Sequence, residues 1–391
     1  MAGGRQYQVR RECDYLCHDS ELTGATRCDR PRAGLGIPIK EEPIKTLTKK
    51  KQNKTNPHSE LSADRVKSLL EKLTSLREEI QIVIIGQEQT IDQLLIAFVA
   101  GGHCLLEGVP GLAKTLMIRT LAQAVDLSYH RIQFTPDLMP SDIIGTEILE
   151  EDHTTGKRFF KFNRGPVFAN IVLADEINRT PPKTQSALLE AMQEFEVTYG
   201  GETYALDRPF FVLATQNPIE QAGTYPLPEA QLDRFMLNVK IDYPEEKDEF
   251  KILSATTSKQ EVQVQPVMKA QDILLAQAIV RDVLINDDLL DYVNRLIRAT
   301  RPQNSEIEFV KEWVRWGAGP RAGQAIILTA KARALLQERF SVTMDDLKMM
   351  AYPVLRHRVL VNFKAEAQRI GADDVTRELL EKVPEPKSPL T

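Results

Sequence analysis

The stretch from Cys104 to Ala122 constrains the fold of this chain more than any other. An apolar run, Cys104-Leu105-Leu106, precedes the loop Gly108-Val109-Pro110-Gly111-Leu112-Ala113-Lys114-Thr115, and a helix-periodic run follows it. A strand, a glycine-containing loop, a Lys-Thr pair and a helix, in that order, are typical of a loop that binds phosphate. The backbone N–H groups of such a loop converge on an anion, Lys114 adds a positive charge, and the Thr115 hydroxyl is a ligand for Mg²⁺.

One residue of this loop departs from the strict pattern. Ala113 stands directly before the lysine, where glycine is usual. Residues with a Cβ rarely adopt a positive φ, so we expect alanine to fit here only with a negative φ. Phosphate binding therefore needs support from other segments of the chain.

Two acidic residues give that support. The apolar run Asn170–Ala174 is followed by Asp175 and Glu176. A buried strand would carry both carboxylates to its carboxyl end, beside the phosphates, where Asp175 is placed to hold Mg²⁺ through water and Glu176 to polarise an attacking water. An Asp-Glu pair can also simply cap the next helix. With the glycine loop upstream, we favour the functional interpretation.

Three further polar residues are candidates for the same site. Asn217 follows the apolar run Phe210–Ala214 and is expected to orient the water together with Glu176, although Asn217-Pro218 is also a common turn sequence. Arg234 precedes the last apolar run, and Arg321 opens a later helical segment. Each arginine is either a surface charge or a ligand of the γ-phosphate, and in P-loop NTPases such a ligand is worth ~10³–10⁵ in rate.

The order of apolar runs predicts an α/β fold. Runs of about five residues alternate with helix-periodic segments up to Pro244, which favours a doubly wound parallel sheet with ligands at the carboxyl ends of its strands. Beyond Pro244 only helices are expected. The runs are Cys104–Leu106, Tyr129–Phe134, Asn170–Ala174, Phe210–Ala214 and Met236–Ile241; hairpins are expected within 147–162 and 195–209, and helices at 270–285, 288–300, 321–339 and 343–364.

This reading divides the chain into four parts. Residues 61–245 form the expected phosphate-binding core and residues 246–380 a helical domain. Residues 1–60 lack periodicity and are expected to be a disordered basic leader, and the proline-containing segment 381–391 a disordered tail. The leader contains potential zinc ligands without paired C-x2-C spacing, so a metal site is disfavoured there; they are Cys13, Cys17, His18 and Cys28.

Composition narrows the class of protein. The chain has 391 residues, of which 42% are apolar and 27% charged, as in a soluble globular protein. Its net charge is −5, with +4 in residues 1–60 and −9 in the remainder, which disfavours a nucleic-acid translocase or helicase. The sequence has no apolar run of membrane-spanning length and no signal peptide, so we expect a cytoplasmic protein.

Taken together, the motifs resemble those of AAA+ ATPases and, among these, of the MoxR family. The resemblance covers about residues 61–380 and includes alanine before the loop lysine, so Ala113 fits it. The segments that carry it are Gly108–Thr115, Leu173–Arg179, Ala214–Pro218, Leu227–Phe235 and Gly319–Ala322.

The resemblance implies a fold, cofactors and residue roles. It implies a P-loop domain with a five-stranded parallel sheet, a C-terminal all-α lid, and ATP and Mg²⁺ as cofactors. Asn217 corresponds to sensor 1, Arg234 to the arginine finger that acts on a neighbouring subunit, and Arg321 to sensor 2. The segment 135–165 is similar to the helix-2 insert of such proteins, and 195–209 to their pre-sensor-1 insert.

The resemblance also implies an assembly and a role. An arginine finger supplied in trans requires a neighbour, so we expect a homo-oligomer, typically a hexameric ring. Relatives act as chaperone-like ATPases that mature or activate partner complexes, often with von Willebrand A-domain proteins. The expected function is therefore an ATP-hydrolysing ring that remodels, activates or matures a protein client. A magnesium-chelatase-like motor subunit, which shares the inserts and the lid, is the alternative.

Overall fold

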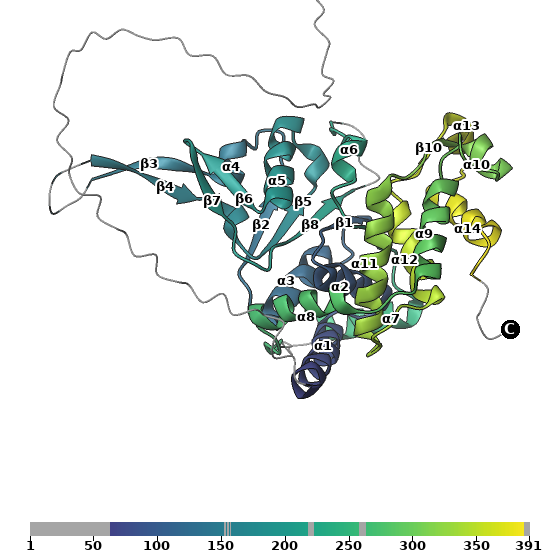
Figure 1. Ribbon diagram of the computed structural model, residues 1–391. Helices are drawn as coiled ribbons and strands as arrows, with labels where there is room; N and C mark the ends of the chain where they lie inside the picture. The colour runs from purple at the N-terminus through teal and green to yellow at the C-terminus, as the bar shows by residue number, and fades with distance from the viewer. Residues whose placement is uncertain are drawn as a thin grey trace, which may run out of the picture. The chain divides into compact units, whose positions relative to one another are not determined.

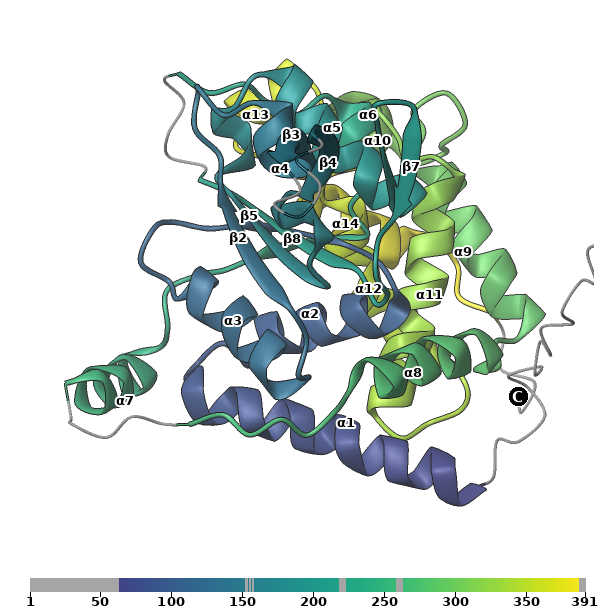
Figure 2. The same ribbon diagram turned by 90° about the vertical axis from the view of Figure 1, so that its left-hand side faces the viewer.

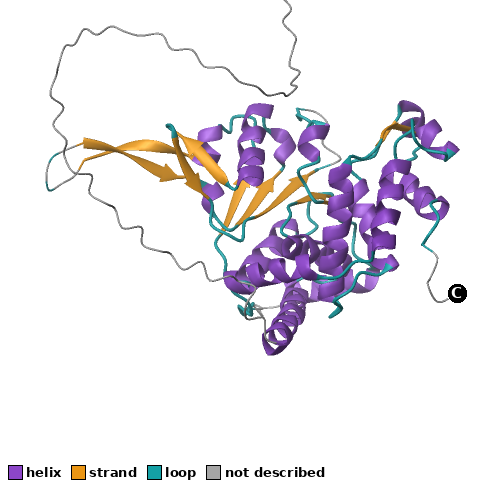
Figure 3. Cartoon of the chain, viewed as in Figure 1, coloured by secondary structure: helices purple, strands orange, loops and turns teal. Residues whose placement is uncertain are grey.

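A computed structural model describes residues 63–151, 154, 156, 158–217, 223–257 and 263–386. The expected leader and its Cys13, Cys17, His18 and Cys28 lie outside these ranges. Five parallel strands pair in the order β2-β5-β8-β1-β9. Figure 1 labels β2, β5, β8 and β1 of this sheet, and Figure 3 draws the strands in orange among purple helices. This confirms the predicted α/β fold. The strands are β1 Cys104–Glu107, β2 Tyr129–Gln133, β5 Ile171–Asp175, β8 Phe211–Gln216 and β9 Leu237–Lys240.

Helices cover both faces of this sheet, which explains why its strands read as continuous apolar runs. Side chains such as Leu106, Leu173 and Leu213 share one core with α1 Ala63–Val83, α2 Glu88–Ala100 and α3 Lys114–Ala124. Side chains of the opposite face, such as Leu105 and Val172, pack with α4 Pro140–Ile144 and α5 Pro182–Glu194. In Figure 2, α1 runs along the outside of α2 and α3.

Both predicted hairpins are present. They consist of β3 Gly145–Glu151 with β4 Arg158–Arg164, and of β6 Glu196–Tyr199 with β7 Glu202–Ala205. The β3–β4 hairpin projects away from the sheet in Figure 1. Its inner end is held by aromatic contacts, because the ring of Phe162 stacks on Tyr204 with a centroid distance of 4.4 Å and lies 5.2 Å from Tyr199.

Four helices agree with the expected helical domain, and their apolar side chains join the core formed by α1–α3. They are α8 Ala270–Asp282, α9 Asp287–Ala299, α11 Pro320–Leu336 and α12 Met344–Leu355. The expected helix 343–364 ends earlier than predicted, because the side chains of residues 356–358 bind backbone carbonyls of Phe235 and of Asn238 in β9. Those contacts are remote in sequence, so helical periodicity cannot reveal them.

Several short elements were not predicted from the sequence. One pair of them forms a small antiparallel ribbon among the C-terminal helices. The helix α7 stands apart on the left of Figure 2 and has no buried residue. These elements are η1 Pro166–Phe168, η2 Ile177–Arg179, α6 Glu229–Leu232, α7 Glu246–Thr256, α10 Glu308–Trp313, β10 Val314–Trp316, β11 Leu360–Val361, α13 Phe363–Ala367 and α14 Ala372–Lys382.

The structure describes the first six residues, 381–386, of the expected tail 381–391. Lys382 ends α14, Val383 is buried, and Glu385 forms an ion pair with Lys348. Residues 387–391 lie outside the described ranges. Among the described helices, none is long and apolar enough to cross a membrane.

A buried histidine links the strand β8 to the helix α5. His103, just before β1, accepts a hydrogen bond at Nδ1 from the Val212 N–H (3.1 Å), so its Nε2 carries the proton and donates to the Met192 carbonyl (3.1 Å). Burial is the main cause that lowers the pKa of His103 from 6.5 to about 4, and the charge of Arg208 acts in the same direction.

We expect this histidine to make stability pH-dependent. Because the pKa is lower in the folded chain than in the unfolded one, the unfolded chain binds the proton first as the pH falls. Stability is then lost progressively from about pH 6.5 to pH 4, by up to about 3 kcal/mol. The melting temperature, measured across this pH range, should fall less steeply with decreasing pH for His103→Gln than for the parent. His130 is exposed, so His130→Gln should behave like the parent. An equal dependence on pH in all three proteins would contradict the assignment.

Candidate active site

The loop Gly108–Thr115, called the glycine loop below, leaves β1 at the carboxyl edge of the sheet and leads into α3. Glycine is required at two of its positions. A Cβ on Gly108 would lie 2.0 Å from Cγ2 of Ile241, and Gly111 has a φ of +88°. The helix α3 begins at Lys114, so its free N–H groups lie next to the loop.

The expectation that Ala113 needs a negative φ is wrong. Ala113 has φ 55° and ψ 23°, in the left-handed region, and acts as the N-cap residue of α3. Its carbonyl accepts the first helical hydrogen bond, from the Met117 N–H (2.9 Å). The geometry of the loop overrides the intrinsic preference of alanine, at a cost on the order of 1 kcal/mol.

The two predicted carboxylates lie at the same edge, at the end of β5. Thr215, at the end of neighbouring β8, donates its hydroxyl to Asp175 Oδ1 (2.6 Å) and accepts from the Glu176 backbone N–H (2.9 Å). Glu176 itself has a φ of +57°. One buried hydroxyl thus fixes both acidic residues relative to each other.

Two residues of β2, which the sequence reasoning missed, also bind these carboxylates. Arg131 donates from Nη2 and Nε to Asp175 Oδ2 (2.6 and 3.0 Å), and Gln133 donates from Nε2 to Glu176 Oε2 (2.8 Å). Arg179 lies 3.2 Å from the same Glu176 oxygen. Arg131 and Gln133 alternate along a strand that pairs with β5, and this alternation was the signal in the sequence that could have revealed them.

The glycine loop and the carboxylates enclose one cavity of about 450 Å³. The structure therefore brings together eight of the predicted site residues: Lys114, Thr115, Asp175, Glu176 and Asn217, with Pro110, Gly111 and Ala113 of the glycine loop. Asn217 is buried at the wall of the cavity. Partial burial lowers the pKa of Lys114, while the charges of Asp175 and Glu176 oppose this shift. The full lining is Pro110, Gly111, Ala113, Lys114, Thr115, Leu116, Asp175, Glu176 and Asn217.

The two predicted arginines lie elsewhere, around a second cavity of about 270 Å³. Arg234 and Arg321 both line it, and Nη1 of Arg321 is 3.7 Å from Oδ2 of Asp233. The structure thus separates the predicted site residues into two groups, one around the glycine loop and one around this arginine cavity.

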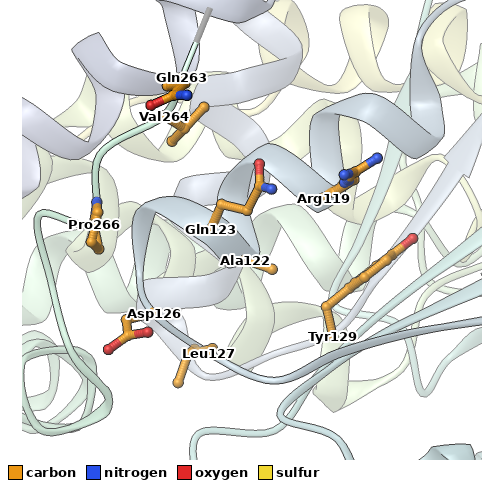
Figure 4. Close-up of a pocket in the computed structure, with 9 residues that line it drawn as sticks. All are labelled: Arg119, Ala122, Gln123, Asp126, Leu127, Tyr129, Gln263, Val264 and Pro266. Carbon is orange, nitrogen blue, oxygen red and sulfur yellow. The ribbon is translucent and has the colours of Figure 1, made fainter.

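A larger cavity, of about 560 Å³, lies at the start of β2, away from the strand end that carries Gln133 (Figure 4). Arg119, Asp126 and Tyr129 are among the side chains around it. The cavity of the glycine loop is smaller, but it combines a lysine, a threonine hydroxyl and two carboxylates. Its chemistry, and not its volume, marks it as the candidate active site.

The residues of this cavity fit a magnesium ion bound with a nucleotide. The Thr115 hydroxyl and the Asp175 carboxylate are hard oxygen donors, and Mg²⁺ usually takes one or two carboxylates and completes its shell with water and phosphate oxygens. The described residues contain no group of three or more His, Cys, Asp or Glu side chains that could hold a metal ion without such help.

Comparison with known proteins places this geometry in a family. The model for the "ATPase family associated with various cellular activities (AAA)" matches residues 103–237, and the model for the "AAA lid domain" matches residues 308–379. "Chaperone MoxR1" of Mycobacterium tuberculosis is 44% identical over 312 residues, 79% of this chain and 81% of the relative. The chain belongs to the MoxR family of AAA+ ATPases.

Other relatives are similar over most of their length. YeaC of Bacillus subtilis is 42% identical over 310 residues, 79% of this chain and 93% of YeaC, and "Protein MoxR" of Paracoccus denitrificans is 29% identical over 304 residues, 73% of this chain and 88% of the relative. A solved structure from Cytophaga hutchinsonii, of a protein assigned as an ATPase, has a TM-score of 0.77 and 43% identity and covers 83% of this chain and 98% of its own. The predicted family and the predicted α/β fold with a helical lid are thereby confirmed.

The positive φ of Ala113 predicts that a glycine at this position is tolerated better than a larger apolar residue. Ala113→Gly should change the free energy of unfolding by less than about 0.5 kcal/mol, because relief of strain offsets the entropy of the freer unfolded chain. Ala113→Val should cost about 2 kcal/mol or more, since a β-branched residue tolerates this region poorly. Chemical denaturation measures both; a valine variant as stable as the parent would contradict the backbone assignment.

Proposed function

We propose that this chain binds and hydrolyses ATP in the cavity of the glycine loop. The observation that carries the proposal is the convergence of Lys114, Thr115, Asp175, Glu176 and Asn217 on one cavity from separate segments of the chain. This is the set of groups that phosphoryl transfer to water requires: anion donors, metal ligands and a carboxylate that can polarise water.

Each group has a proposed role. The N–H groups of the glycine loop and the Lys114 ammonium bind the phosphates, and Thr115 and Asp175 hold Mg²⁺. Magnesium, when bound, neutralises charge on the phosphate oxygens. Glu176 polarises the attacking water, and Asn217 orients it. Arg131 binds Asp175 and Gln133 binds Glu176, so we propose that these two residues of β2 orient the carboxylates that hold the metal and polarise the water.

We further propose that Arg234 and Arg321 act on the nucleotide of a neighbouring subunit. Both line the arginine cavity, which is distinct from the cavity of their own glycine loop. An arginine that neutralises charge in the transition state is worth ~10³–10⁵ in rate, so a separated pair implies a head-to-tail assembly. Such an assembly closes into a ring, which we take to be hexameric.

The biological role we propose is chaperone-like. A relative that is 44% identical is named a chaperone, and this supports a ring that remodels, activates or matures a protein complex. We propose a von Willebrand A-domain partner and a cytoplasmic location, with residues 61–245 as the ATPase core and residues 246–380 as the lid.

Two substitutions test the ATP site. Lys114→Ala should abolish nucleotide binding, and Glu176→Gln should leave binding intact but lower turnover at least 100-fold, because binding and water activation use different groups. Equilibrium binding of ATP and phosphate release measure the two effects. The Glu176→Gln protein, trapped with ATP, should retain client protein that Lys114→Ala does not. Undiminished hydrolysis by Glu176→Gln would refute the proposal.

Mixing variants tests the action in trans. Arg234→Ala and Arg321→Ala should each lose most turnover alone but regain part of it when mixed with Glu176→Gln subunits, whose arginines are intact. Mixing with the double variant Arg234→Ala/Glu176→Gln supplies the control and should not restore activity. If no mixing ratio restores turnover to the Arg234→Ala protein, its arginine does not serve a neighbour.

A further inference from the structure

We propose that Arg358, just beyond the end of α12, is the positioning residue for Arg234. In this view the lid, and not the glycine loop of the same chain, sets where Arg234 stands relative to the next subunit. The inference rests on the proposed function, because it concerns the arginine that is proposed to act in trans.

Arg358 contacts the residues that flank Arg234 in the sequence, on its N-terminal and its C-terminal side. The Arg358 side chain is 4% exposed, and its Nε donates to Asp233 Oδ1 (2.7 Å). Its Nη2 donates to the carbonyls of Phe235 (2.7 Å) and Asp233 (3.3 Å). Its Nη1 donates to the carbonyls of Met236 (3.1 Å) and Val354 (2.8 Å). These contacts match the five N–H donors of a guanidinium, four of them directed at residues 233–236.

The two residues before Arg358 support the same segment. His357 is buried, and its Nε2 donates to the Phe235 carbonyl (3.0 Å). Arg356 donates from Nη1 to the Asn238 carbonyl (2.5 Å) and is itself held by Asp373 through Nε (2.9 Å). The segment between α6 and β9, and the start of β9 itself, are therefore bound to the lid largely through their backbone carbonyls.

Asp233 connects this support to the second arginine. Its Oδ1 accepts from buried Arg358, and its Oδ2 lies 3.7 Å from Arg321, which opens α11. Arg234, Arg321 and Arg358 all line the arginine cavity. Because α11 and α12 pack against each other, a displacement of the lid moves the anchors of Arg234 and Arg321 together.

Lysine cannot reproduce this support. A buried guanidinium is tolerated because each donor is paired, and its planar fork reaches several acceptors at once, whereas an ammonium has three donors around one point. Arg358→Lys thus keeps the charge opposite Asp233 but loses contacts on either side of Arg234. A displacement of a catalytic group by about 1 Å costs up to roughly 100-fold in rate.

The test uses the full chain with Arg358→Lys and a matched control. Arg333→Lys alters another lid arginine, which pairs with buried Asp346 and lies outside the arginine cavity lining. We expect Arg358→Lys to lower kcat roughly 10- to 100-fold while the affinity for ATP changes less than twofold. Arg333→Lys should lower the melting temperature with turnover close to that of the parent.

Mixed assemblies separate positioning from a general structural role. Arg358→Lys subunits should regain turnover when mixed with Glu176→Gln subunits, but not when mixed with Arg234→Ala subunits, since neither then supplies a well-placed arginine. The double variant Arg234→Ala/Arg358→Lys should be no slower than Arg234→Ala alone. If Arg358→Lys does not fold, Asp233→Asn, which removes the carboxylate partner and keeps its shape, is expected to give the same pattern.

The outcomes are distinguishable. Rescue of Arg234→Ala without rescue of Arg358→Lys, or full turnover of Arg358→Lys, would overturn this inference and leave the proposed function standing. Failure to rescue Arg234→Ala itself would overturn the action in trans on which the inference rests. Rescue of both, with unchanged ATP affinity, would support it.

Discussion

The parallel pairing of β1, β5 and β8 is the constraint on which the candidate site depends. Parallel strands end at one edge, and the observed register sets Glu107 opposite Gln216 and Ala174 opposite Ala214. Each part of the candidate site ends or directly follows one of these strands: the glycine loop follows β1, the Asp175-Glu176 pair lies at the end of β5, and Asn217 follows β8. The pairing of the strands is therefore sufficient to bring these groups together. Burial of the strands on both faces supports this register, since a slip along the strand direction would draw polar residues at the strand ends, such as Asp175, into the core.

The parts of the site that the sequence predicts correctly are those carried by local patterns. An apolar run followed by acidic residues predicts both the strand and the position of Asp175 and Glu176 at its end. The loop pattern predicts the position of Lys114 and Thr115. Arg131 and Gln133 were missed because their importance arises from a neighbouring strand that is distant in sequence. The conformation of Ala113 was mispredicted for a related reason: propensity describes the isolated residue, whereas the loop and the start of α3 determine its φ.

The same distinction applies to the C-terminal helices. Their apolar stripes predict α8, α9, α11 and α12, but the end of α12 is set by carbonyl groups near residue 235. The separation of the arginine cavity from the glycine loop also depends on tertiary contacts. Family membership names candidate residues, and the structure then places some of them around the glycine loop and others around the arginine cavity.

One apolar core is shared by α1–α3, the sheet, the helices α8 to α12 and the helix α14. The helix α2 packs against β9 as well as α8 and α11, so opening the chain between sheet and lid would expose apolar surface at about 25 cal/mol per Å². Because they share this core, the sheet and the lid are not joined by a hinge, and we expect them to move together. A conformational change at the glycine loop is therefore expected to be transmitted through the packed core to the arginine cavity.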